Sequence, residues 1–336
     1  NLNMSRKKIL LLDTSNNTEN MGDFIIMDSV QKQLRKIFPD DFFINASTHE
    51  TIGKKTHEWH REAAYTFLGG TNLLSGRYIG KNRAQWRFGF TDSKYINDVI
   101  GLAVGWQSDR KYTRTKDIPF VFAQKKLYKN SMNDKILHSV RDSFTQKRML
   151  EYGIGSINTA CVTMWDLTPE HLQNIKQTKS STVVMTLTDY RRDQEFLESY
   201  RDMLLILIKN YQQIFLWVQS AADIDLLAEL GFAEEDRIML LSPTLQALDN
   251  VLNKEDIDYV GTRLHAGIRA LQHGRRTVVI EVDNRAREIA RDTNLKTLNY
   301  QNISKLDALI NSTFDMDIHV PFDQIERWKS QFISEI

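Results

Sequence analysis

The hydrophobic pattern of the chain is a repeated alternation of short apolar runs with longer amphipathic segments. The apolar runs, rich in aliphatic, β-branched or aromatic residues, predict strands at 8–12, 64–68, 102–105, 119–123, 182–187, 214–218, 237–241, 257–260 and 277–282. Apolar residues recur with a helical period between many of these runs, as at 26–37, 144–152, 224–230 and 245–252. Strands that alternate with helices predict an α/β fold.

The chain divides into two halves at a polar stretch, 168–180, which contains Pro169 and several Lys and Gln residues. A chain of 336 residues exceeds the size at which one hydrophobic core stops growing, so two domains are expected. We place an N-terminal Rossmann-like domain at 1–170 and a C-terminal Rossmann-like domain at 180–321, facing each other across a cleft. The helical tail, 322–336, is predicted to pack back on the N-terminal domain.

The block 258–283 reads as a turn, a helix that ends at Gly274 and a buried strand. Thr262 is the predicted N-cap, which puts Arg263 and His265 in the first helical turn. Backbone N–H groups, the positive end of the helix dipole, a guanidinium and an imidazole would then meet, an arrangement that favours a phosphate or a carboxylate. The alternative is a solvated surface arginine beside a structural histidine.

Further polar residues follow other predicted strands or begin helices, where ligands of doubly wound domains bind. They are Asn20, Gly22 and Asp23, then Gly69, Gly70, Thr71 and Asn72, and finally Arg191 and Arg192. Arg141, Asp142 and Ser143 stand directly before the amphipathic segment 144–152. Structural interpretations also exist, with Asp23 as a helix cap, the glycines as a tight turn, and either Asp142 or Ser143 as the cap of the helix that follows. The basic and aromatic stretch 76–90 could stack on sugars, although aromatic packing in the core is favoured.

Composition excludes several classes of protein. The 44 Lys and Arg residues nearly balance the 43 Asp and Glu residues, which argues against a nucleic-acid partner. The single cysteine, Cys161, excludes a disulfide framework and a cysteine-rich metal site, and a reducing cytosol fits this usage. The apolar runs 9–12 and 203–208 are too short for a signal peptide or a membrane span, so a soluble, cytoplasmic protein is expected.

Two patterns in the chain are similar to metal sites. His57-Glu58-Trp59-His60 lacks the spacing of the zinc motif H-E-x-x-H, and a surface helix is predicted there. The acidic pairs at 223–225 and 315–317 lack the rest of a calcium loop. No metal site built by the protein is predicted.

Arg263-Leu264-His265 at a helix start, followed by the pattern of Ile268, Ala270, Leu271 and Gly274, resembles the C-terminal signature of the polysaccharide pyruvyl transferase family. The Asn-x-Gly-Asp block at 20–23 and the Arg-Asp block at 141–142 occur in the family's order. Thr71 stands where the family usually has a third glycine, and only Cys161 matches its Gly-Cys-Pro. The matches run from 20 to about 283.

This resemblance implies the glycosyltransferase-B type of architecture and a reaction with phosphoenolpyruvate as donor and no cofactor. The family moves the enolpyruvyl group to two hydroxyls of a sugar, forms a cyclic pyruvate ketal and releases phosphate. Arg263 and Thr262 would then hold the phosphate, Arg191 or Arg192 would hold the other end of the donor, and His265 would transfer protons. The residues expected on the acceptor side are Asn20, Asp23, Gly70, Asn72 and Arg141.

Two other functions stay open. A glycosyltransferase of the same architecture would use Arg263 for the diphosphate of a nucleotide sugar, and Glu281 or Asp283 could be taken for its ribose ligand. A non-catalytic relative would only bind a glycan or a phosphate. The acceptor could be a capsule or exopolysaccharide unit on a lipid carrier, a cell-wall polymer or a free glycan, and the oligomeric state is not specified. A lipid-linked acceptor would bring the enzyme to the inner membrane face.

Overall fold

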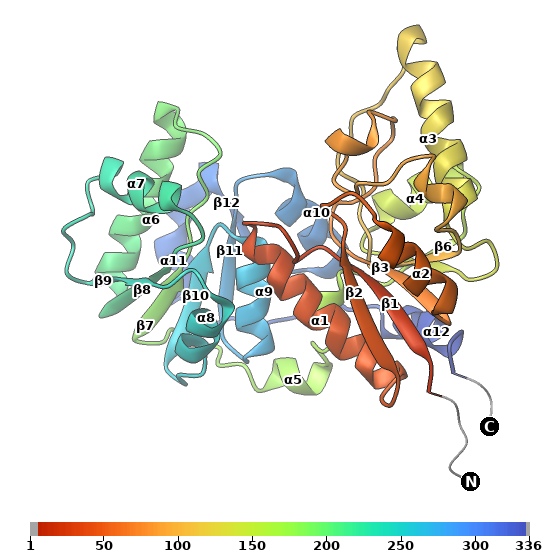
Figure 1. Ribbon diagram of the computed structural model, residues 1–336. Helices are drawn as coiled ribbons and strands as arrows, with labels where there is room; N and C mark the ends of the chain where they lie inside the picture. Colours follow the sequence, from red (N-terminus) through yellow and green to blue (C-terminus); the bar gives the residue numbers. More distant parts are fainter. Residues whose placement is uncertain (1–5, 334–336) are drawn as a thin grey trace. The chain divides into compact units, whose positions relative to one another are not determined.

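The computed structural model describes residues 6–333, which form two compact α/β units (Figure 1). The first unit contains residues 6–18, 26–165 and 321–333, and the second contains residues 19–25 and 166–320. The chain thus leaves the first unit after Trp165 and returns to it at Pro321. Residues 19–25, which the sequence analysis places in the N-terminal domain, pack in the second unit.

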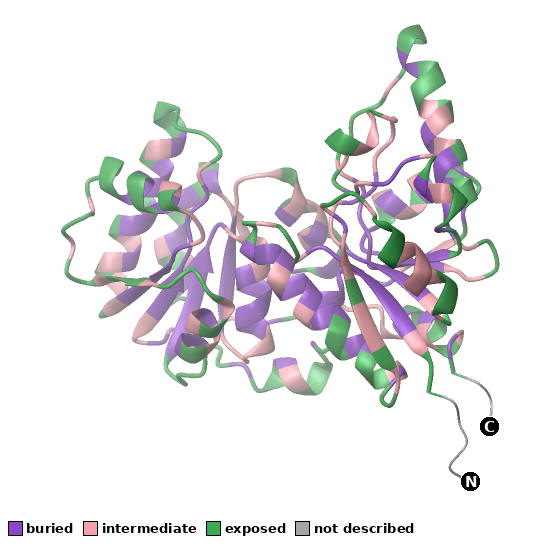
Figure 2. Ribbon diagram, viewed as in Figure 1, coloured by how far each residue is buried: buried purple, intermediate pink, exposed green. Residues whose placement is uncertain are grey.

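The first unit is built on a four-stranded parallel sheet with the order β2-β1-β3-β4. These strands are β1 (Lys8–Asp13), β2 (Phe42–Ser47), β3 (Tyr65–Gly69) and β4 (Val99–Leu102), and a separate parallel pair is formed by β5 (His138–Val140) and β6 (Ser156–Asn158). The helices are α2 (Lys54–Glu62), α3 (Ile118–Ser131), α4 (Ser143–Glu151), α12 (Phe322–Ser330) and most of α1 (Met21–Ile37). The apolar run of β1 is buried on both faces of the sheet (Figure 2).

The C-terminal helix α12 completes the core of the first unit. The ring centroids of Trp328 and Phe67 lie 6.0 Å apart, and Phe332 lies 5.3 Å from Phe67. Trp328 is completely buried. The tail therefore packs against β3, and of the expected range 322–336 only residues 334–336 lie outside the described part of the chain.

The second unit is built on a six-stranded parallel sheet with the order β12-β11-β10-β7-β8-β9. Its strands are β7 (Thr182–Met185), β8 (Gln213–Trp217), β9 (Ile238–Leu241), β10 (Ile257–Gly261), β11 (Thr277–Glu281) and β12 (Thr297–Asn299). Its helices are α5 (Pro169–Gln173), α6 (Gln194–Asn210), α7 (Ala221–Glu229), α8 (Leu245–Leu252), α9 (Leu264–Gln272), α10 (Asn284–Thr293) and α11 (Leu306–Asn311).

The strand order creates a switch point in the middle of this second sheet. The chain begins at β7, runs outward through β8 and β9, and then returns to pair β10 with the other side of β7. The connections after β7 and after β10 consequently diverge at the carboxyl ends of these two strands. Ligands of doubly wound sheets bind at such a switch point.

The predicted strands of the second half are all confirmed, with bounds within a few residues. The strand predicted at 119–123 is wrong, because this stretch lies in α3 and two of its aromatic side chains, Phe120 and Phe122, are exposed rather than buried. The strand predicted at 102–105 is misplaced, because β4 ends at Leu102 and shares only that residue with it. β2 was not predicted because it is a partly exposed edge strand without a long apolar run. Within residues 6–333, no helix is long and apolar enough to cross a membrane.

Candidate active site

Threonine side chains join the loops that follow β7 and β10 at the switch point. The hydroxyl groups of Thr188 and Thr262 are hydrogen-bonded at 2.8 Å, and the Thr262 hydroxyl lies 3.2 Å from the Thr186 carbonyl oxygen. All three threonines are buried. Gly261 allows this close approach, because a Cβ atom there would lie 2.4 Å from the Thr186 hydroxyl oxygen. The contacts fix the start of the segment that carries Arg263.

Arg263 lies at the switch point and is held by a buried carboxylate. Its Nε donates to the Leu187 carbonyl oxygen at 3.0 Å, and its Nη2 lies 3.5 Å from Asp223 Oδ1. Asp223, in the first turn of α7, is fully buried and also accepts a hydrogen bond from the backbone N–H of Gln219 at 2.9 Å. The Arg263 side chain is 23% exposed, so part of a fixed guanidinium faces solvent.

Asp223 is a residue that the sequence analysis considered only as part of an incomplete calcium loop. Its partnership with Arg263 joins positions 40 residues apart, and no local spacing indicates it. Within residues 6–333, no group of three or more His, Cys, Asp or Glu side chains is arranged to hold a metal ion.

Thr262 is not the N-cap of α9, and this prediction is wrong. Arg263 occupies the N-cap position with extended backbone angles, φ −91° and ψ 109°, and the helix begins at Leu264. The Thr262 hydroxyl is instead bonded toward the end of β7. The Arg263 side chain makes no capping hydrogen bond to the first turn of α9. Backbone N–H groups at the start of a helix favour an anion, which would lie beside Arg263 here.

Two buried tyrosines support the same loops. The Tyr259 hydroxyl donates to the Arg263 carbonyl oxygen at 2.7 Å, and the Tyr200 hydroxyl donates to the Thr188 carbonyl oxygen at 2.9 Å. Burial raises the pKa of both phenols, so both stay protonated donors at neutral pH. The sequence does not distinguish these tyrosines from ordinary core residues, because only their hydroxyl partners mark them.

His265 lies on the first turn of α9, half-buried beside residues 19–25. A Cβ atom added to Gly22 would lie 3.5 Å from His265 Nδ1 and 3.1 Å from Asn20 Oδ1. Asn20 Oδ1 accepts a hydrogen bond from the Gly22 backbone N–H at 3.0 Å, and Asp23 is buried in the same turn. The structure thus brings Asn20 and Gly22 close to the imidazole within the second unit, and Asp23 is the next residue in the chain.

Arg191 and Arg192 follow β7, and each is paired with carboxylates. Arg191 makes hydrogen bonds of 2.7 and 3.2 Å to Asp193, the N-cap of α6. Arg192 makes hydrogen bonds of 2.9 and 3.1 Å to Asp189 and also contacts Glu229. Both side chains are more than a third exposed. An anionic substrate would therefore compete with these carboxylates for either arginine.

Arg285 is a further arginine at this edge of the second sheet, in the first turn of α10. It donates to the Tyr190 hydroxyl at 2.6 Å and lies 3.1 Å from Asp283 Oδ2. Tyr190 belongs to the loop after β7, so the side chain of Arg285 links the ends of two strands. The sequence gives only a weak signal for Arg285: it stands two residues after Asp283, the N-cap of α10, which follows β11.

Gly70 and Asn72 lie at the carboxyl end of β3 in the first unit. A Cβ atom on Gly70 would lie 2.1 Å from the Ala103 carbonyl oxygen, so the glycine is needed for backbone packing. The Oδ1 atom of Asn72 is buried and has no hydrogen-bond partner among the described residues. A buried acceptor without a partner costs stability, which makes Asn72 the better ligand candidate of the two.

Arg141 follows β5 and is buried against its neighbours. Its Nε lies 3.3 Å from Asp142 Oδ2, and a Cβ atom on Gly105 would lie only 2.3 Å from the same Nε. Asp142 Oδ1 accepts a hydrogen bond from the Thr145 backbone N–H at 2.7 Å, which confirms Asp142 as the N-cap of α4. Arg141 therefore covers the glycine that follows β4, near the end of β3.

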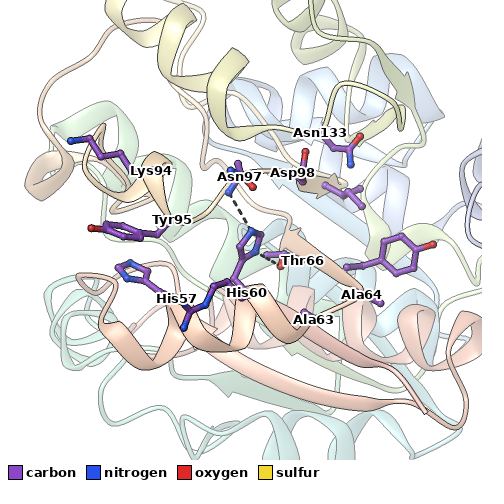
Figure 3. Close-up of a pocket in the computed structure, with 13 residues that line it drawn as sticks. His57, His60, Ala63, Ala64, Thr66, Lys94, Tyr95, Asn97, Asp98 and Asn133 are labelled. Atoms are coloured by element: carbon purple, nitrogen blue, oxygen red, sulfur yellow. Dashed lines mark hydrogen bonds between the residues drawn. The ribbon is translucent and has the colours of Figure 1, made fainter. Parts of the chain in front are cut away.

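A cavity of about 560 Å³ lies beside α2 at the amino end of β3, the opposite end of that strand from Asn72 (Figure 3). His57 stacks on Tyr95 with ring centroids 4.6 Å apart, and His60 is hydrogen-bonded to the Thr66 hydroxyl at 2.7 Å. Burial lowers the pKa of His60. The predicted surface helix is confirmed, because α2 contains no buried residue.

Solved structures similar to this one include sugar-nucleotide epimerases. UDP-GlcNAc 2-epimerase from Methanocaldococcus jannaschii, in complex with UDP-GlcNAc and UDP, matches with 10% sequence identity and a TM-score of 0.53 over 95% of this chain and 98% of that chain. A putative UDP-N-acetylglucosamine 2-epimerase from Listeria monocytogenes matches with 11% identity and a TM-score of 0.52 over 97% of this chain and 91% of that chain. At such identities the likeness shows the fold, two Rossmann-like domains of the glycosyltransferase-B type.

No curated protein sequence matches the chain significantly. The model of the family described as polysaccharide pyruvyl transferase matches residues 20–284, from the asparagine that neighbours His265 to the first residue of α10. This range covers most of the chain and includes the switch point of the second sheet, and the chain therefore belongs to the polysaccharide pyruvyl transferase family.

Proposed function

We propose that this protein transfers the enolpyruvyl group of phosphoenolpyruvate to two hydroxyls of a saccharide and so forms a pyruvate ketal during surface polysaccharide biosynthesis. The observation that carries the proposal is Arg263, a partly exposed arginine held at the switch point by buried Asp223, at the N-cap position of α9. The family match and the neighbouring His265 support it.

Donor binding requires cations, because phosphoenolpyruvate carries a phosphate and a carboxylate on three carbons. Arg263 and the backbone N–H groups at the start of α9 would bind the phosphate. The carboxylate would be bound by Arg191 or Arg192, since both follow the neighbouring strand β7. Their present partners, Asp193 and Asp189, keep these guanidinium groups oriented until the donor competes for them.

The reaction needs one group that can both give and accept a proton. Protonation of C3 of phosphoenolpyruvate converts its methylene into a methyl group and makes C2 electrophilic. The first sugar hydroxyl adds to C2 and loses its proton, phosphate leaves with the electrons of its C2–O bond, and the second hydroxyl then adds to C2. The second hydroxyl proton is released with the phosphate, and no cofactor takes part. His265 is the proposed acid and base.

The residues proposed for the acceptor are polar groups that can hydrogen-bond to a saccharide. Asn20 lies beside the same glycine as His265, where the reacting hydroxyls must arrive, and Asp23 follows that glycine in the chain. Asn72 and Arg141 lie at strand ends of the first unit, and the unpaired carbonyl of Asn72 could accept a hydrogen bond from a sugar hydroxyl. Gly70 would contribute only by shaping the end of β3.

Calorimetric titration with phosphoenolpyruvate, UDP and UDP-GlcNAc tests the proposal. We expect phosphoenolpyruvate to bind. Arg263→Ala should weaken that binding by about a hundredfold, because a hydrogen bond to a charged group contributes roughly that factor to affinity. Arg201→Ala, an exposed arginine of α6, is the matched control and should bind normally. If UDP binds and phosphoenolpyruvate does not, a nucleotide-sugar enzyme would be favoured. If none of the three compounds binds, the protein would be interpreted as a non-catalytic relative.

A further inference from the structure

The first turns of helix α3 expose large apolar side chains. Ile118 is 59% exposed, Phe120 is 44% exposed and Phe122 is 67% exposed. In Figure 1 this helix extends from the rest of the first unit, and Figure 2 shows that much of its surface is exposed. A monomeric protein rarely presents such neighbouring apolar residues to water unless something covers them.

The orientation of α3 is fixed by its other face. Residues on that face are buried in the first unit, and they are Gln124, Leu127, Tyr128 and Ser131. The Tyr128 hydroxyl accepts a hydrogen bond from the Ser75 backbone N–H at 2.9 Å. Rotation of the helix cannot hide Ile118 and Phe122, since it would expose this packed face.

The exposed face of α3 continues as a line of lysines. Phe122 lies four residues after Ile118, and Lys126 and Lys129 follow at helical spacing, so the four side chains share one face. Lys126 and Lys129 are exposed. The face therefore begins apolar and continues cationic.

The segment around the start of α3 is strongly basic although the whole chain has a formal net charge of only +1. Between 109 and 129, seven basic residues stand against two acidic ones: Arg110, Lys111, Arg114, Lys116, Lys125, Lys126 and Lys129 against Asp109 and Asp117. Asp117 is buried and lies 3.2 Å from Arg77, a basic residue outside this segment. The surface charge next to the apolar residues is accordingly positive.

We propose that α3 and the loop before it, residues 109–129, form a docking surface for an anionic lipid bilayer. Ile118 and Phe122 would enter the boundary between head groups and acyl chains, while the surrounding lysines and arginines would contact lipid phosphates. A bilayer satisfies both features at once, whereas a second copy of this surface would bring like charges together. The docking surface goes beyond the proposed pyruvyl transfer and does not rest on it.

Co-sedimentation of the full chain with lipid vesicles tests this surface. We expect binding to vesicles that contain phosphatidylglycerol, little binding to vesicles of phosphatidylcholine alone, and release as the salt concentration rises. Phe122→Ser should lower the affinity by about tenfold or more, and Lys126→Gln should lower it by about fivefold. Both side chains are exposed, so the thermal unfolding of these variants should match that of the wild type.

Matched controls separate the surface from general effects of the substitutions. Leu205→Ser removes a leucine of α6 that is 52% exposed, and Lys54→Gln removes an exposed lysine of α2, and neither should change vesicle binding. Equal binding to neutral and anionic vesicles, or unchanged binding by Phe122→Ser, would overturn the proposal. So would self-association of the wild type that Phe122→Ser abolishes while vesicle binding stays absent, since a second copy would then cover the patch.

Discussion

Replacement of Asp249 by asparagine should destabilise the second unit by breaking an ion pair between α8 and α9. Asp249 Oδ1 accepts a hydrogen bond from Arg269 Nε at 2.7 Å, and Oδ2 accepts one from Arg269 Nη2 at 2.8 Å. His273 Nε2 lies 2.9 Å from the same Oδ1. The substitution keeps the size of the side chain and one acceptor oxygen, but it removes the charge that balances Arg269.

The expected loss of unfolding free energy follows from the burial of the two partners. The Arg269 side chain is only 6% exposed, whereas that of Asp249 is 25% exposed. Removal of one partner of a fully buried pair costs about 3–5 kcal/mol. Water can reach Asp249 and part of the hydrogen bonding survives, so we expect about 2–3 kcal/mol. For a unit of this size that corresponds to a fall in Tm of about 4–12 °C.

The effect of Asp249→Asn should depend on pH in a defined direction. Burial alone would raise the pKa of Asp249, but hydrogen bonds from Arg269 and His273 outweigh it and hold that pKa below its usual value. A carboxyl group with a depressed folded-state pKa stabilises the protein above its unfolded pKa of about 3.9. This stabilisation is lost as the pH falls through the folded-state pKa. The difference in unfolding free energy between the wild type and Asp249→Asn should therefore become smaller in acid.

Urea unfolding monitored at several pH values measures this difference. Asp225→Asn makes the same chemical change at an exposed site of α7 and should cost less than about 0.5 kcal/mol. An Asp249→Asn variant as stable as the Asp225→Asn control at neutral pH would show that the pair contributes nothing. A gap that widens in acid would refute the assigned direction of the pKa shift.

Two other substitutions test the packing and the chemistry. Gly70→Ala should destabilise the first unit by about 1–3 kcal/mol in thermal unfolding, because its Cβ would lie 2.1 Å from the Ala103 carbonyl oxygen. Gly53→Ala is the control, since a Cβ there meets nothing within 4 Å. Equal stabilities of the two variants would contradict the packing argument. His265→Ala should reduce pyruvyl transfer by about 10²–10⁴-fold while phosphoenolpyruvate still binds in calorimetry. His319→Ala, an exposed histidine, should keep full activity, and a fully active His265→Ala variant would exclude the imidazole from the reaction.

Local patterns predicted the parts of the site that depend on neighbouring residues. The strand, turn and helix around Arg263 follow from a short apolar run, a helical period and Gly274, which adopts φ +76° just after α9. The Thr262 prediction failed because the choice of N-cap depended on Thr186 and Thr188, more than seventy residues away. The propensity of threonine for N-cap positions cannot predict that its hydroxyl hydrogen-bonds to residues that follow another strand.

Long-range packing explains the other differences between sequence and structure. The run at 119–123 has the aromatic content of a buried strand, yet Phe120 and Phe122 point to solvent on a helix. The role of Asp223 and the packing of residues 19–25 beside His265 both depend on contacts between distant segments. The sequence therefore predicted which residues carry charge at strand ends, but not how they are held.

The return of α12 to the first unit constrains the folding of this unit during synthesis. Trp328 and Phe332 complete an aromatic cluster with Phe67, but the ribosome adds them only after the whole of 166–320 has been synthesised. Domains generally fold in the order of their synthesis, but the first unit cannot complete its core until residues beyond the second unit have been synthesised. Until then Phe67 lacks its contacts with Trp328 and Phe332, and the apolar surface left exposed makes the nascent chain prone to aggregation.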